Sequence, residues 1–146
     1  MREIELSYNP TLDNAQWATI AVRQVVAALL KSIEVRFIED VDKFISEIEL
    51  AAGEACCNAV KHGPHKGNDN VQVLVSLNNT ETKFTVAVSD GNPEYDFSNR
   101  EPDFEALPEN GYGIHIMRTV MDEVTYRRDK GRNIVIMEKQ IQQGEE

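Results

Sequence analysis

The sequence has few cysteines and no long apolar stretch, and each shortage excludes a class of protein. Cys56 and Cys57 are the two cysteines in 146 residues. Neighbouring residues of a helix point about 100° apart, so a disulfide between them is not expected, and two cysteines alone make no zinc site. The longest apolar stretch, residues 25–30, is far shorter than the roughly 18 residues of a membrane span, and the alternating residues 1–10 show no signal peptide. These absences predict a cytoplasmic protein that does not act at a membrane.

Basic residues are scarce as well. There are 15 Lys and Arg against 25 Asp and Glu, which gives a formal net charge of −10. Direct DNA or RNA binding needs a basic footprint, so this balance argues against it. A local basic partner, or an anionic ligand held through a divalent cation, stays compatible with such a chain. Hydrophobic residues make up 41% of the sequence and the length suits one domain, expected over residues 1–146.

The spacing of apolar residues predicts three helices and five strands. Alternation indicates a first strand, and the residues around Pro10 and Thr11 are typical of a helix start. Trp17 and Phe44 are expected in the core. In chain order the predicted elements are a strand at 2–8, helices at 12–32 and 40–62, strands around 71–75 and 84–88, a helix at 111–121, and strands at 123–128 and 133–141.

This order of elements predicts an α+β fold with the helices on one face of a mixed sheet. Residues 92–110 form a long segment without periodicity, and they contain three prolines and several acids. A loop of that length in a compact domain is usually functional or disordered.

The first candidate motif lies on the second predicted helix. Glu54, Asn58 and His62 follow one another at i, i+4 and i+8, so their side chains project along one stripe of an otherwise Ala-rich helix. A carboxylate and an amide oxygen suit Mg²⁺. A solvated helix face explains the pattern equally well, and His62 is more simply a helix cap than a catalytic group.

Two further motifs are weak when taken singly. Asp90 leaves a strand into a turn, where its carboxylate can accept a hydrogen bond from a base amino group or simply belong to an Asp-Gly turn. Gly111 and Gly113 flank Tyr112 directly before a predicted helix, where backbone N–H groups can approach a phosphate. No Walker A pattern occurs in the chain.

Taken in order, these motifs resemble the GHKL ATPases, the Bergerat-type nucleotide-binding family that includes histidine kinases, gyrase B and Hsp90. The similarity is strongest to the small stand-alone branch, the anti-sigma-factor serine/threonine-protein kinases. It covers nearly the whole chain and is most specific at residues 54–63, 111–117 and 121–124. It implies a two-layer α/β sandwich whose sheet is mixed, mostly antiparallel and covered by helices on one face.

The resemblance also implies roles for the motifs. Asn58 is expected to coordinate the Mg²⁺ that bridges the phosphates of ATP, and Glu54 to act as general base on the hydroxyl of a substrate serine. Asp90 is expected to bind the adenine amino group, and residues 92–110 to form the ATP lid. Further nucleotide contacts are expected from Gly91, Asn92, Gly111, Tyr112 and Gly113.

The branch further implies the partners of the protein. The substrate serine is expected on a STAS-type anti-anti-sigma protein, and the kinase is expected to sequester a sigma factor. Members of this branch often act as dimers, so a homodimer is a further expectation. A complete histidine kinase is not expected, because neither dimerisation helices nor a phospho-accepting histidine helix precede the domain.

Two departures from the family pattern keep a second hypothesis open. The family has Asp-x-Gly where this chain has Asp90-Gly91-Asn92, and it often has a glycine where this chain has Asn110. Asn tolerates a positive φ better than most residues, so the turn is expected to survive. The predicted lid is acidic and repels a triphosphate unless Mg²⁺ or a partner compensates. The alternative is a regulatory binding module of the same fold that binds ATP weakly or not at all.

Overall fold

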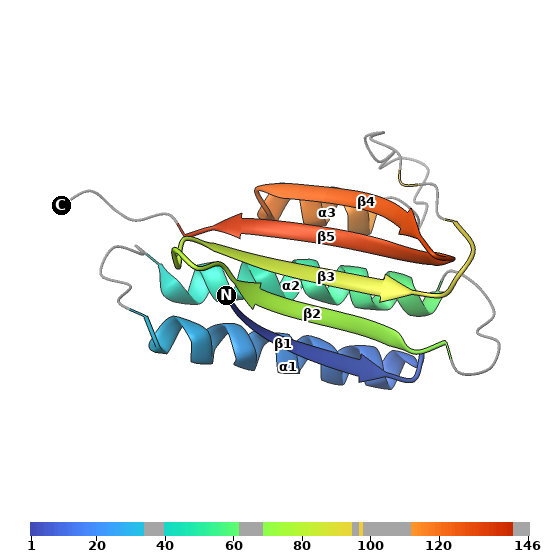
Figure 1. Ribbon diagram of the computed structural model, residues 1–146, viewed down its shortest axis with the longest axis horizontal. Helices are drawn as coiled ribbons and strands as arrows, with labels where there is room; N and C mark the ends of the chain where they lie inside the picture. Colours follow the sequence, from blue (N-terminus) through green and yellow to red (C-terminus); the bar gives the residue numbers. More distant parts are fainter. Residues whose placement is uncertain (34–39, 62–68, 95–96, 98–111, 142–146) are drawn as a thin grey trace.

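The computed structural model describes residues 1–33, 40–61, 69–94, 97 and 112–141. Eight elements follow one another within these residues (Figure 1). They are β1 (Arg2–Tyr8), α1 (Leu12–Lys31), α2 (Val41–Lys61), β2 (Val71–Leu77), β3 (Lys83–Asp90), α3 (Tyr112–Val120), β4 (Glu123–Asp129) and β5 (Arg132–Gln140). The predicted helices and strands are all present, and their bounds differ from the predicted ones by few residues.

The five strands form one sheet in the order β1-β2-β3-β5-β4, and the three helices cover one of its faces (Figure 1). This arrangement confirms the predicted α+β fold with helices on one side. The sheet was expected to be mixed, but each of the four strand pairs is antiparallel. The reason is that β5 lies between β3 and β4, so these two strands run in the same direction without touching as neighbours.

Both long helices begin at a side chain that accepts a backbone hydrogen bond. The backbone N–H of Asn14 donates to Oγ1 of Thr11 over 3.1 Å, and that of Lys43 donates to Oδ1 of Asp40 over 2.9 Å. Such caps satisfy one of the N–H groups that the first turn of a helix leaves without a partner. They explain why the helix starts predicted near Thr11 and Asp40 agree with the structure.

The core lies between the sheet and the helices. The strands supply alternating apolar residues, and the helices supply mostly small ones, so the two layers approach closely. Fully or nearly fully buried side chains include Val73, Val75, Phe84, Val86 and Met137 from the sheet and Val22, Val26, Ile48, Ala55 and Ala59 from the helices.

The predicted core position of Trp17 is wrong, whereas that of Phe44 is confirmed. Trp17 is 69% exposed, while Ala18, the next residue of α1, is buried. One step along a helix turns the side chain by about 100°, so Trp17 lies off the stripe that faces the sheet. Phe44 is buried and its ring centroid lies 6.0 Å from that of Phe84.

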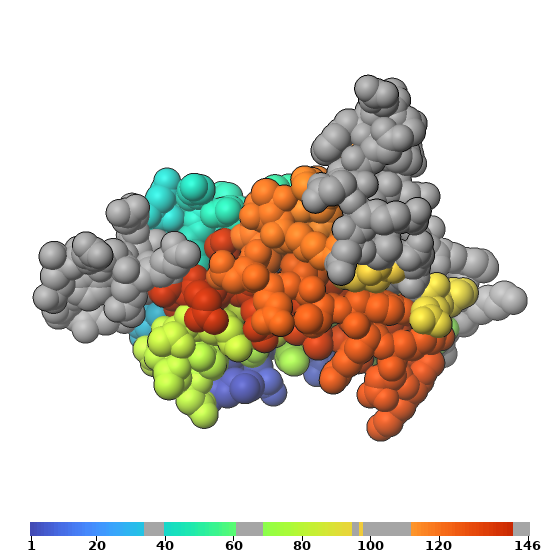
Figure 2. All heavy atoms as spheres, turned by 90° about the horizontal axis from the view of Figure 1, so that it is seen from above, coloured from blue at the N-terminus to red at the C-terminus, as the bar shows by residue number. Residues whose placement is uncertain are grey.

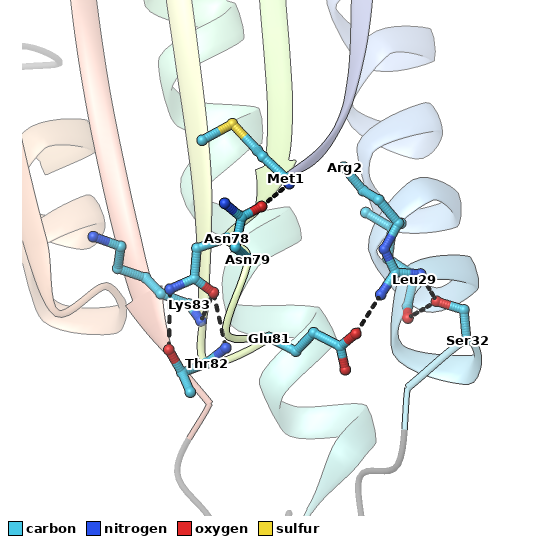
Figure 3. A network of polar contacts seen from close by, with 9 residues as sticks. All are labelled: Met1, Arg2, Leu29, Ser32, Asn78, Asn79, Glu81, Thr82 and Lys83. Atoms are coloured by element: carbon cyan, nitrogen blue, oxygen red, sulfur yellow. Dashed lines mark hydrogen bonds and ion pairs between the residues drawn. The ribbon is translucent and has the colours of Figure 1, made fainter.

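The turn between β2 and β3 is closed by one asparagine side chain (Figure 3). Oδ1 of Asn78 accepts hydrogen bonds from the backbone N–H groups of Thr82 at 2.8 Å and Lys83 at 3.0 Å. Next to this turn, the guanidinium of Arg2 pairs with the carboxylate of Glu81 at 3.2 Å and thereby ties β1 to the turn. Asn78 therefore replaces the backbone acceptors that the two N–H groups lack.

We expect Asn78→Ala to lower the free energy of unfolding by about 1–3 kcal/mol, because two backbone N–H groups lose their acceptor. Urea denaturation of the wild type and the variant measures the difference. The matched control is Asn79→Ala, whose side chain contacts only the amino group of Met1 among the interactions drawn in Figure 3. Equal losses in the two variants would contradict the role given to Asn78.

Candidate functional site

The predicted site residues that the structure describes lie toward the end of the sheet where β3 ends and β5 begins. The carboxyl-terminal half of α2 and the first turn of α3 lie at this same end (Figure 1). A β-carbon at position 113 would lie 2.9 Å from Oε2 of Glu54 and 3.2 Å from Nδ2 of Asn58. The absence of a side chain at Gly113 therefore allows the carboxylate and the amide to approach the backbone of α3.

This approach brings an acid to the positive end of a helix. Gly113 belongs to the first turn of α3, where backbone N–H groups have no partner within the helix and attract negative charge. That turn holds no acidic residue of its own, so Glu54 of α2 supplies the negative group. Tyr112 is the first residue of α3, whereas Gly111, His62 and nearly all of the predicted lid lie outside the described residues.

The donor atoms at this point are hard oxygen ligands. Asn58 presents an amide whose Oδ1 lies 3.7 Å from the same β-carbon position. Among the described residues, no three His, Cys, Asp or Glu side chains gather into a group that could hold a metal ion. A magnesium ion commonly takes only one or two protein ligands and completes its shell with water and substrate phosphates. Asn58 therefore fits a magnesium ion that a nucleotide brings with it.

Asp90 ends β3 as a buried carboxylate. The residue is 2% exposed, and Oδ1 accepts hydrogen bonds from the backbone N–H of Asn92 and from Nδ2 of Asn133, each over 2.9 Å. Donors on both sides satisfy a charge that would otherwise be costly to bury. The carboxylate is therefore fixed in one orientation at the end of the sheet.

Asn92 preserves the turn after Asp90, but not through the positive φ on which the prediction was based. The described residues with positive φ are Glu81, Lys130 and Gly131, so Asn92 does not use the left-handed conformation that asparagine tolerates. Instead its side chain is buried, and Nδ2 donates to the carbonyl oxygen of Ala59 over 2.8 Å. Ala59 follows Asn58 on α2, so this bond joins the Asp90 turn to the helix of the predicted metal ligand.

Gly91 is needed for a close approach. A β-carbon at this position would lie 2.8 Å from Cγ and 3.0 Å from Cβ of Asp69, closer than atoms of two side chains come. The segment that enters β2 therefore packs directly against the backbone of the Asp90 turn. No side chain larger than hydrogen fits here without displacing Asp69.

Sequence reasoning missed the residues of the β4–β5 hairpin that face Asp90. Tyr126, Arg128 and Asn133 form hydrogen bonds with one another and with the Asp90 turn. One signal was available, because Asn133 stands in the alternation of buried residues that continues with Val135 and Met137. A polar residue in a buried register needs partners inside the fold.

Burial raises the pKa of two further ionisable side chains, Tyr8 and Cys56. The hydroxyl of Tyr8 donates to the carbonyl oxygen of Cys56 over 3.4 Å, and burial, reinforced by Cys56, raises the pKa of Tyr8 far above its ordinary value. Burial also raises the pKa of the Cys56 thiol to about 11, although the hydrogen bond with Tyr8 acts in the opposite direction. Neither cysteine forms a disulfide, as the sequence predicted.

We expect alkylation to distinguish the two cysteines. The reactive species is the thiolate, and with a pKa of about 11 the buried Cys56 remains a thiol at pH 8. Iodoacetamide at pH 8 should therefore label the half-buried Cys57 first, and both residues once urea unfolds the chain, as peptide mass spectrometry can show. The Cys57→Ser variant serves as control and should take no label until it unfolds. Equal labelling of both cysteines in the folded wild type would contradict this prediction.

No helix among the described residues is long and apolar enough to cross a membrane. Comparison with known families gives a match over residues 12–139 to the family described as histidine kinase-like ATPase domain. Serine-protein kinase RsbW of Bacillus thuringiensis is 30% identical over 107 residues, which cover 67% of this chain and 65% of that protein. RsbW of Bacillus subtilis is 30% identical over 101 residues, covering 63% and 62%. The match thus spans a little less than two thirds of the length of these relatives.

Solved structures with a similar fold include the RsbU and RsbW domains of a Mycobacterium tuberculosis protein. This likeness has a TM-score of 0.67 at 14% identity and covers 95% of this chain and 32% of that one. The SiaB–SiaC complex from Pseudomonas aeruginosa gives a TM-score of 0.58 at 13% identity, with 94% and 89% covered. At these identities the likenesses establish the fold alone. Because the family match covers most of the sequence, the chain belongs to the histidine kinase-like ATPase domain family, the GHKL group that its motifs predicted.

Proposed function

We propose that this protein is an ATP-dependent serine kinase of the anti-sigma-factor type. It binds Mg-ATP, phosphorylates a serine of a STAS-type anti-anti-sigma protein and sequesters a sigma factor in the cytoplasm. The observation that carries the proposal is the close approach of Gly113 to Glu54 and Asn58. It brings a candidate base, a candidate magnesium ligand and the first turn of a helix to one point. Phosphoryl transfer requires groups that position the reactants and neutralise charge, and these three can do so.

In the proposed reaction Asn58, Glu54 and the start of α3 have separate roles. Asn58 would hold a magnesium ion through its amide oxygen, and the ion, when bound, neutralises charge on the phosphates. Glu54 would accept the proton of the substrate serine as the serine oxygen forms a bond to the γ-phosphorus of ATP and the bond between that phosphorus and ADP breaks, so that ADP leaves. The N–H groups at the start of α3 face the phosphate side, where a helix N-terminus favours negative charge. Positive charge from these two sources also offsets the acidity of the predicted lid.

Asp90 forms the opposite end of the proposed nucleotide site. Its buried carboxylate is suited to accept a hydrogen bond from the amino group of adenine, and Gly91 and Asn92 shape the turn around it. Tyr112 and Gly113 contribute the start of α3, next to Gly111. The hydrogen bond from Asn92 to Ala59 supports this arrangement, because it couples the base end of the site to the helix that carries Asn58.

The proposed partners rest on the relatives. The curated relatives are named as serine-protein kinases, which supports a protein serine as the phosphate acceptor. The structural neighbour from Pseudomonas is a complex of SiaB with SiaC, which supports action through a second protein. The sigma factor and a homodimer follow from the anti-sigma-factor branch that the motifs resemble.

A non-catalytic binding module of the same fold is the second candidate. It is favoured by the replacement of the family glycine with Asn92. Against it stands the bond that Asn92 makes to α2, because this bond preserves the turn around Asp90 instead of opening it. Nucleotide binding and phosphoryl transfer separate the two candidates.

We expect Glu54→Gln to keep Mg-ATP affinity and to lower phosphoryl transfer by about a hundredfold or more, the range that a general base supplies. Transfer of labelled phosphate to a purified STAS protein measures the rate, and calorimetry measures affinity. The matched control is Glu49→Gln on the same helix, whose 2.6 Å ion pair with Arg23 lies near the surface. Transfer at a near wild-type rate in the Glu54 variant would show that Glu54 is not the base.

We expect Asn58→Ala to lower the affinity for Mg-ATP by about tenfold or more, equivalent to about 1.4 kcal/mol. Titrations in Mg²⁺ and in EDTA isolate the metal-dependent part, which the variant should lose. Asn79→Ala, in the turn between β2 and β3, is the control and should bind as the wild type does. A wild type that binds no nucleotide in Mg²⁺ would favour the binding module.

A further inference from the structure

The hairpin that joins β4 and β5 gathers positive charge in a chain that is acidic overall. Four of the 15 Lys and Arg side chains lie within residues 127–132, whereas the formal net charge of the chain is −10. They are Arg127, Arg128, Lys130 and Arg132, which together are called the basic hairpin below. Arg132 is half-buried and the other three are exposed. In Figure 2 the orange-red atoms of this hairpin project from the body of the molecule.

The backbone that carries these cations forms a tight turn. Asp129 pairs with Arg132, so Lys130 and Gly131 alone make up the loop. Both loop residues have a positive φ, 51° at Lys130 and 76° at Gly131, as a type I′ turn requires. Such a turn matches the twist of the two strands that it joins. The cations are therefore held on a short, well-defined backbone.

Two of the guanidinium groups are oriented by neutral acceptors. Nη1 of Arg128 donates to the carbonyl oxygen of Asn92 over 3.1 Å and to Oδ1 of Asn133 over 2.9 Å. Nε of Arg132 donates to Oγ of Ser89 over 2.8 Å, and its Nη2 donates to two backbone carbonyl oxygens at 2.7 and 3.1 Å. Carbonyl, amide and hydroxyl oxygens carry no formal charge, so they fix the guanidinium groups without neutralising them. A guanidinium has five N–H groups, which leaves donors for a further acceptor.

The described carboxylates do not neutralise these cations either. The ion pairs between described residues lie elsewhere in the molecule. Within the part of the chain that the structure describes, the side chains of Arg127 and Lys130 form no hydrogen bond or ion pair. An anion that binds to the basic hairpin therefore has no ion pair with a described residue to displace.

We propose that the basic hairpin is a docking surface for a short acidic segment of a partner protein. Carboxylates form strong, charge-assisted hydrogen bonds with guanidinium groups. Because two of these groups are already oriented, their binding costs less side-chain freedom. The hairpin lies at the end of the sheet where β3 ends, so a docked protein would lie beside the candidate site (Figure 1). The inference itself requires neither nucleotide binding nor phosphoryl transfer.

The distribution of charge favours an acidic protein segment over a nucleic acid. The positive patch is small and has acids at its border. Asp129 lies within the hairpin, and Asp69 precedes Asn70, whose carbonyl oxygen accepts a hydrogen bond from Arg132. A nucleic acid carries charge along its whole length and binds through an extended basic footprint, so it would meet repulsion on both sides of the patch. A few consecutive Asp or Glu residues can contact the four cations alone.

The test uses hexaglutamate labelled with fluorescein as the probe, and fluorescence anisotropy measures its affinity. We expect the wild type to bind the peptide at low ionic strength and to bind it more weakly as salt is added. The double variant Arg127→Gln with Lys130→Asn removes two exposed charges and should weaken binding by about fivefold. Asn before Gly is the preferred sequence of a type I′ turn, so the variant should keep the hairpin.

The matched control is Lys31→Gln with Lys43→Gln, which removes the same number of exposed charges at the opposite end of the molecule (Figure 1). Because salt screens charges at that distance, its affinity should stay within about twofold of the wild type. A wild type that does not bind hexaglutamate, or equal losses in the two double variants, would overturn the inference.

A competing oligothymidylate distinguishes the two kinds of acidic partner. If it bound the wild type more tightly than hexaglutamate does, and lost this affinity in the hairpin variant, the surface would be a nucleic-acid site and the inference would be wrong. We expect the peptide to bind more tightly. All of these titrations are made without ATP, so their outcome leaves the proposed kinase activity to be decided by its own experiments.

Discussion

The buried carboxylate of Asp90 is the constraint on which this end of the molecule depends. Placing a charge inside a fold costs on the order of several kcal/mol unless donors surround it. The donors come from two directions, the backbone of Asn92 in the same turn and the side chain of Asn133 across the sheet. Each donor is itself held, Asn92 by the carbonyl of Ala59 and Asn133 by Tyr126. Satisfying one carboxylate therefore fixes β3, β4, β5 and α2 relative to one another.

Helix α2 links this constraint to the proposed chemistry. Its small buried residues let α2 lie close to the sheet. On the same stretch of α2, Glu54 and Asn58 lie against Gly113 at the start of α3. The same helix accepts the hydrogen bond from Asn92, so the base end and the phosphate end of the proposed site are built on one rigid element. Phosphoryl transfer depends mainly on positioning and on neutralising charge, and a site built in this way meets the first need. For the second, an acidic chain has to obtain positive charge from a bound cation and a helix N-terminus.

Much of the fold could be predicted because its signals are local. Alternation defines β2 and β3, and side-chain caps at Thr11 and Asp40 start the two long helices. The order of the motifs further pointed to the family that the comparison over residues 12–139 confirmed. Trp17 was predicted in the core because it is apolar, but it is exposed. The apolar character of one side chain does not determine whether it lies on the helix face that packs against the sheet.

The sequence by itself determined the elements and their order, because periodicity and capping act over a few neighbours along the chain. Only the tertiary structure decided that β5 separates β3 from β4, that Gly113 meets Glu54, and that Asn133 faces Asp90. Asn133 lies 43 positions beyond Asp90, and no local pattern sets the pairing of residues so far apart. Strand register and the burial of a carboxylate fix that pairing together, since the buried charge is satisfied only when a donor stands opposite.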